Sequence, residues 1–63
     1  MTNQEERALL VGPMELIGRA LSQLHSLNKE TKYMVYDRAC VKLSDQLALL
    51  QQHDLYLERN TKQ

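Results

Sequence analysis

The chain has 63 residues, and its eight basic and eight acidic side chains cancel to a formal net charge of zero. A chain of this length forms one domain near the lower limit for independent folding. Zero net charge argues against a nucleic-acid-binding protein, since that class usually carries a basic excess on one face. No apolar run reaches the ~18 residues that span a membrane, and the polar, acidic start is unlike a secretory signal. We therefore expect a cytoplasmic protein without membrane contact.

So short a chain needs stabilisation beyond its own core. Ordering 63 residues costs ~95 kcal/mol, and small proteins offset part of that with disulfides, metals or a partner subunit. The single cysteine, Cys40, cannot form an internal disulfide, and no cluster of Cys and His suggests zinc. Oligomerisation remains, so we expect a homodimer.

The N-terminal part predicts two short helices. The segment Thr2–Glu5 has the spacing of a capping box, which starts a helix over residues 3–10. The pair Gly12-Pro13 then interrupts the pattern, because proline lacks the amide of the preceding turn and is favoured at a first helical position. We therefore expect a new helix over residues 13–27. One kinked helix over residues 3–27 is the alternative.

The C-terminal half predicts one long helix. The polar segment Ser26–Thr31 is rich in capping residues, so we expect it to form the connection, with Thr31 or Asn28 as the N-cap. A helix over residues 31–58 follows, and residues 59–63 have the composition of a frayed tail. The whole chain is thus expected to be one helical domain.

Apolar residues recur at alternating spacings of three and four, which is the periodicity of packed helices. The predicted core and dimer contacts are Leu10, Met14, Ile17, Leu21, Leu24, Tyr36, Cys40, Leu43, Leu47, Leu50 and Leu57. At 1.5 Å per residue the helix over 31–58 is about 42 Å long and the helix over 13–27 about 22 Å. An antiparallel hairpin of the two leaves roughly half of the longer stripe bare. The expected fold is therefore an all-α homodimer of helical hairpins, each with a short N-terminal helix, resembling a four-helix bundle.

The stripe of the long helix begins at Tyr33 and is interrupted at Asp54, between Leu50 and Leu57. Either the packed seam ends near Leu50, or Asp54 is a buried polar residue that fixes the register of the helices. The polar residues that directly precede Asp54 favour the first interpretation.

A second, narrower apolar line lies well away from the main stripe of the long helix. Met34, Val41, Ala48 and Leu55 are spaced by seven, so they follow one side of the helix. The residues of this possible second interface are Met34, Val41, Leu49, Leu55 and Tyr56. The line is expected to meet a second subunit or a target, and the alternative is scattered surface apolar residues, which are common.

No catalytic, metal-binding or cofactor-binding site is predicted. Cys40 lies inside the apolar stripe without a neighbouring base, so we predict a small core residue. His25 and His53 fall on different helices, far apart in an antiparallel hairpin, and fit no shared metal site. The carboxylates alternate with basic residues, as on a solvated helix face, and no nucleotide-binding loop occurs. We predict that the protein is not an enzyme.

The start of the chain, MTNQEERAL, resembles the start of the RNA-one modulator (Rop) family of plasmid copy control. The matching residues are Met1, Thr2, Gln4, Glu5, Ala8 and Leu9. This resemblance implies a homodimeric bundle of helical hairpins that binds paired RNA hairpins. The family's RNA-binding face is polar and basic, whereas the same helix here carries Leu10, Gly12-Pro13, Met14 and Gly18. The resemblance therefore favours the architecture and argues against RNA binding.

The length, the start and the tail LERNTKQ are similar to a family of 63-residue early proteins. These are encoded between the exonuclease and excisionase genes of phage lambda and related lambdoid phages. The resemblance implies a phage regulatory protein with a role in the lysis–lysogeny choice or in host takeover, inside the bacterial cell. We therefore expect a non-catalytic regulator that acts by protein–protein interaction, with itself and with a host or phage protein. The alternative is a Rop-like modulator that binds RNA or another nucleic acid.

Overall fold

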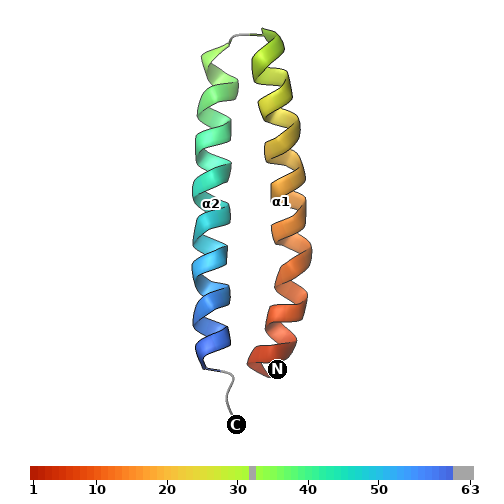
Figure 1. Ribbon diagram of the computed structural model, residues 1–63, viewed down its shortest axis with the longest axis vertical. Coiled ribbons are helices and arrows are strands. Elements are labelled where there is room, and N and C mark those ends of the chain that lie inside the picture. The colour runs from red at the N-terminus through yellow and green to blue at the C-terminus, as the bar shows by residue number, and fades with distance from the viewer. Residues whose placement is uncertain (32, 61–63) are drawn as a thin grey trace.

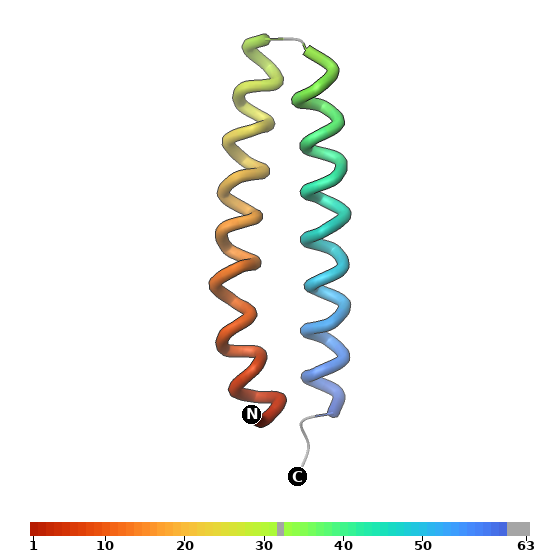
Figure 2. Tube along the Cα trace, turned by 180° about the vertical axis from the view of Figure 1, so that it is seen from behind, coloured from red at the N-terminus to blue at the C-terminus, as the bar shows by residue number. Residues whose placement is uncertain are grey.

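The protein is a helical hairpin, seen in a computed structural model that describes residues 1–31 and 33–60. Helices α1 (Asn3–Thr31) and α2 (Met34–Arg59) run antiparallel, side by side (Figure 1). The view from behind shows the same pairing from one end of the molecule to the other (Figure 2). No strand occurs in the described ranges, which confirms the all-α helical hairpin. The hairpin is a rod of 50 × 15 × 13 Å.

A capping box starts α1. The Thr2 amide donates to Glu5 Oε1 at 2.8 Å, and the Glu5 amide donates to Thr2 Oγ1 at 3.1 Å. The hydrogen bond from the Thr2 backbone amide, with a smaller contribution from the Thr2 side chain, lowers the pKa of the Glu5 carboxyl. The box satisfies helix amides that have no partner within α1, so the N-terminal start of the helix forms as the sequence predicts.

The expected break at Gly12-Pro13 is wrong, because α1 continues through Pro13 as one helix. The separate helices over residues 3–10 and 13–27 therefore do not exist, and the short N-terminal helix is the first part of α1. Pro13 and Leu9 are both exposed, so water can satisfy the Leu9 carbonyl that a proline leaves without its helical donor. Leu10 and Met14 are half-buried on either side of the interruption. Packing against α2 thus holds both halves in one line and overrides a local breaking signal.

The connection also differs from the expectation. Residues 26–31, predicted as the link, form the last turns of α1. Thr31 does not cap α2, because its Oγ1 donates back to the Leu27 carbonyl at 3.0 Å. Tyr33 stands at the N-cap with an extended backbone (φ −90°, ψ 135°) and no side-chain capping bond. The predicted caps Thr31 and Asn28 are therefore wrong, and α2 begins three residues later than expected, at Met34 instead of residue 31.

The C-terminal end of α2 is capped by Asn60. Its backbone amide donates to the carbonyls of Tyr56 and Leu57, each at 3.2 Å, and its Nδ2 donates to the Tyr56 carbonyl at 2.8 Å. The frayed tail predicted over residues 59–63 falls mostly outside the described residues, which end at Asn60.

The seam between the helices is thinly covered. Among the described residues, Cys40 and Leu57 are the buried side chains, with 4% and 3% of their surface exposed. The half-buried apolar residues of the seam are Leu10, Met14, Ile17, Leu21, Leu24, Tyr36, Leu43, Leu47 and Leu50. Tyr33, expected at the start of the stripe, is instead exposed and meets Tyr36 edge to face. Two helices alone therefore leave most of their apolar stripe partly open to solvent.

Since α1 is a 29-residue helix, it reaches along the whole of α2. The expectation that half of the α2 stripe stays bare is therefore wrong. Leu57, in the last turn of α2, is among the most buried side chains. The surface left open lies on the two sides of the seam and not at its end.

We predict that Pro13→Ala stabilises the protein. In a continuous helix the substitution restores a backbone donor and removes a clash, a gain of ~3 kcal/mol, reduced by up to ~1 kcal/mol because the unfolded chain becomes freer. Chemical denaturation followed by helical circular dichroism would measure the change.

Gly12→Ala is the companion to this experiment. A Cβ at Gly12 would meet no atom within 4 Å, so we expect a gain of about 1 kcal/mol from helix propensity. If Pro13 instead began a separate helix, Pro13→Ala would leave stability unchanged or lower it, and that outcome would contradict the continuous α1.

Candidate functional site

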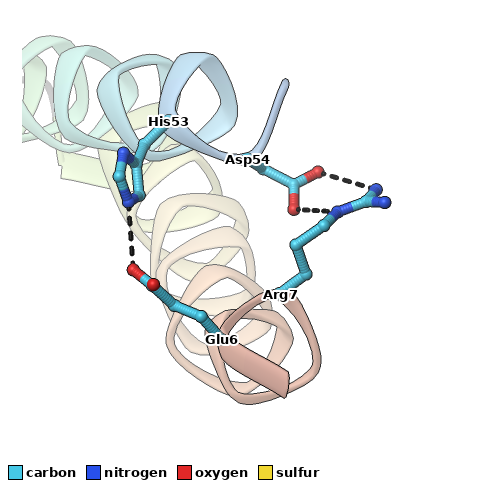
Figure 3. A network of polar contacts seen from close by, with 4 residues as sticks. All are labelled: Glu6, Arg7, His53 and Asp54. Atoms are coloured by element: carbon cyan, nitrogen blue, oxygen red, sulfur yellow. Dashed lines mark hydrogen bonds and ion pairs between the residues drawn. The ribbon is translucent and has the colours of Figure 1, made fainter. Parts of the chain in front are cut away.

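Two polar pairs at the open end of the hairpin define its two faces. Arg7 pairs with Asp54, and Glu6 pairs with His53, on opposite sides of the helix pair (Figure 3). The side that carries Arg7 and Asp54 is called the Asp54 face below, and the other side the His53 face. Because residues seven apart lie on nearly the same side of a helix, each face can be followed along the rod from these pairs.

The Arg7–Asp54 pair closes the seam near its open end. Arg7 Nε donates to Asp54 Oδ1 at 3.0 Å, and Nη2 donates to Oδ2 at 3.4 Å. This fork-on-carboxylate geometry directs both donors to one acid, and the hydrogen bond to Asp54 is the main cause that raises the pKa of the Arg7 guanidinium. Both side chains are partly shielded, with 34% and 26% of their surface exposed.

The preferred interpretation of Asp54 as the end of the seam is wrong. Leu57 is buried beyond it, so the apolar packing continues past the acid. Asp54 is a partly buried polar residue at a seam position, satisfied by a partner on the other helix. Such a pairing sets the register of the two helices, because a shift of one turn would separate the two groups.

The second pair is more exposed. His53 Nε2 lies 3.1 Å from Glu6 Oε2, and about half of each side chain is exposed. The His53 ring also stacks on Tyr56, with the ring centres 6.0 Å apart. Close by, Asn3 Nδ2 donates to the Asn60 carbonyl at 3.1 Å. These exposed contacts add little stability singly, but together with Arg7–Asp54 they join the free ends of both helices.

The Asp54 face carries two shallow grooves between the helices. The first, of about 270 Å³, is lined by Val11, Met14, Glu15, Leu47, Gln51 and Asp54. The second, of about 260 Å³, is lined by His25, Asp37, Cys40, Val41, Ser44 and Asp45. Cys40, Leu47 and Asp54 follow each other at intervals of seven, so both grooves open on the same face. Gly18 lies midway between Val11 and His25, and the space above it is open.

The two grooves share one electrostatic character. Their linings contain four carboxylates, from Glu15, Asp37, Asp45 and Asp54. Among the described residues that line them there is no lysine or arginine, and Arg7 neutralises Asp54 alone. The Asp54 face is therefore an apolar groove with a negative border on a chain whose net charge is zero.

The His53 face is mostly apolar beyond the Glu6–His53 pair. Along α1, Pro13, Ala20 and Leu27 continue the line of spacing seven that starts at Glu6. Leu9 and Leu16 lie beside this line, three and ten positions after Glu6. Along α2 the face carries Val35, Leu49 and Tyr56, in one line of spacing seven with Lys42. Leu16 and Leu49 are 65% and 59% exposed, so these side chains are open to a partner.

The structure distributes the predicted second interface over both faces. Its five residues are all exposed: Met34, Val41, Leu49, Leu55 and Tyr56. Val41 lines a groove of the Asp54 face, whereas Tyr56 stacks on His53. The five residues of the predicted second interface therefore border two different surfaces of α2.

The described side chains that could bind a metal ion are dispersed over the hairpin. Over residues 1–31 and 33–60 no group of three or more His, Cys, Asp or Glu side chains is arranged to hold a metal ion. His25 lies in the groove near Asp37, while His53 pairs with Glu6 near the open end. Cys40 is a free, buried thiol in the seam. Neither helix, over its described residues, is long and apolar enough to cross a membrane.

Arg7, the partner of Asp54, is not among the residues predicted from the sequence. The sequence contains a signal for this ion pair. Arg7 lies three residues before Leu10 and so continues the α1 seam, and Asp54 interrupts the α2 seam. In an antiparallel hairpin two opposite charges at similar distances from the turn face each other. The expected helix break concealed this relation, since it separated Arg7 from the seam that begins at Leu10.

Comparison with known proteins gives no further guide to the site. No protein family, curated protein or solved structure matches the chain.

We predict that Arg7 and Asp54 are energetically coupled more strongly than Glu6 and His53. The first pair is better shielded from water and forms two bonds, so salt screens it less. Double-mutant cycles with alanine at each pair, measured by chemical denaturation at low and high salt, would give both coupling energies. Equal coupling in the two pairs, or none at Asp54, would mean that this contact does not fix the register.

Proposed function

We propose that this chain is a non-catalytic regulatory protein that forms a homodimer and acts by contact with another protein. The observation that carries the proposal is the surface that the hairpin leaves open. The exposed large apolar side chains include Leu9, Val11, Leu16, Val35, Val41, Leu49, Leu55 and Tyr56. So much exposed apolar surface on a small chain is typical of a protein that associates with others.

The accessible area supports association. The hairpin exposes 5256 Å². A compact monomer of 7.3 kDa is expected to expose about 4,200 Å². The excess of about 1,100 Å² is larger than the ~800 Å² that one subunit buries in an interface of standard size. One dimer contact of standard size along the rod would remove most of this excess, and four helices would then share one core.

The His53 face is the better surface for the second copy. A two-fold symmetric dimer places each surface against itself. Pairing of two Asp54 faces would bring the carboxylates of Glu15, Asp37 and Asp45 together, which is electrostatically unfavourable. Pairing of two His53 faces instead brings together leucines such as Leu16 and Leu49, whose burial is favourable.

The biological setting rests on the resemblance to the lambdoid early proteins. It supports a regulator of the lysis–lysogeny choice or of host takeover, in the cytoplasm of a bacterial host. The hairpin architecture also fits the second candidate, a Rop-like modulator that binds RNA. The carboxylates of the Asp54 face disfavour that candidate, because they repel phosphates.

We predict a dimer mass of twice 7.3 kDa by light scattering, and a melting temperature that rises with protein concentration. Leu16→Glu should abolish both, because it places a charge in the apolar contact. Gln52→Glu is the matched control, since it adds the same charge at an exposed helical position that is not among the residues of the His53 face.

A helical monomer whose melting temperature does not depend on concentration would contradict the dimer. Binding of paired RNA hairpins at physiological salt, retained by the wild type and lost in variants of its basic residues, would favour the Rop-like candidate over a protein-binding regulator.

A further inference from the structure

We propose that the groove of the Asp54 face binds a cationic amphipathic helix of a partner protein. The inference rests on the proposed function, because it names the kind of partner that such a regulator would contact. The binding site lies on the Asp54 face, which the proposed dimer leaves free. The residues of the binding site are those that line the two grooves on either side of Gly18.

The floor of the groove is apolar. The half-buried Met14 and Leu47 line the first part, and the buried Cys40 lines the second. Val11 and Val41 stand at its edges, each about half exposed. A ligand that carries a continuous apolar stripe would cover these side chains and complete the burial that two helices cannot achieve.

The form of the ligand follows from the walls of the groove. Both walls are α-helices, whose backbone amides and carbonyls are bonded within the helix, as in α1 and α2. An extended peptide would find no backbone partners there and would leave its own polar groups unsatisfied. A helix satisfies its own backbone and presents an apolar stripe at intervals of three and four, which fits a groove between two helices.

The charge of the ligand follows from the border. Glu15, Asp37 and Asp45 lie along the groove, and its described lining includes no lysine or arginine. Lysine or arginine residues flanking the apolar stripe of the ligand would meet these acids and improve both specificity and the rate of association. The same acids disfavour nucleic acid and a second, symmetric copy of this face.

The test uses a labelled synthetic helix of leucine and lysine, with the leucines on one side, titrated with the full chain and followed by fluorescence anisotropy. A counterpart of leucine and glutamate has the same shape and the opposite charge. We expect the lysine helix to bind, its affinity to fall with rising salt, and the glutamate helix to bind far more weakly.

Two pairs of variants locate the site. Val41→Gln and Asp45→Asn change the groove, and each should weaken binding about fivefold, the equivalent of about 1 kcal/mol. Glu30→Gln also neutralises a carboxylate, at an exposed position outside the grooves, and should leave the affinity unchanged. Val35→Gln makes the same change as Val41→Gln but on the His53 face, so it should leave the affinity for the lysine helix unchanged even where light scattering shows a weakened dimer. Circular dichroism of all four confirms that the hairpin is intact.

Light scattering on the same samples separates this inference from the proposed dimer. If the protein is dimeric but the lysine helix does not bind, or binds all four variants equally, the groove inference is wrong and the dimer stands. If Val41→Gln dissociates the dimer, the second copy occupies the groove, and the inference is also wrong. Equal binding of the glutamate helix overturns it as well. If the wild type is monomeric, the dimer fails, and the titrations still decide the groove.

Discussion

Two helices packed side by side can cover only one stripe of each other, and the rest of this structure depends on that limit. The facing stripes are made of leucines, yet Cys40 and Leu57 are the side chains of the described chain that become buried. The remaining seam residues stay half-exposed, and further leucines, valines and tyrosines lie outside the seam. A chain with so little buried surface is expected to gain stability from association, which links its folding to its partners.

The polar contacts at the open end have a different role from the seam. Apolar stripes on two helices can slide by one turn at modest cost, because one leucine resembles the next. The Arg7–Asp54 pair fits one register, since both groups are partly withdrawn from water and each satisfies the other. The same contact requires α1 to reach the end of α2, and the continuity of α1 through Pro13 makes that possible. Helix length and register thus support each other.

Four of the eight acidic side chains line the grooves of the Asp54 face, although the chain has no net charge. The groove of the Asp54 face is bordered by Glu15, Asp37 and Asp45, whereas Lys42 lies in the apolar line of the other face. In the arrangement that we propose, the His53 face forms the dimer and the groove binds a basic ligand, so the two contacts would not compete for one face.

The sequence by itself determined the features that depend on near neighbours along the chain. Helix propensity and the period of three and four residues predicted an all-α helical hairpin, although with a separate short N-terminal helix, and the spacing of Thr2 and Glu5 predicted the capping box, because these interactions span a single turn. The tertiary structure decided the rest. At Gly12-Pro13 the local signal favoured a break, but packing on both sides of it against α2 kept one helix. The Arg7–Asp54 pair and the two faces join residues far apart in sequence, and they exist only once an antiparallel neighbour sets which side chains meet.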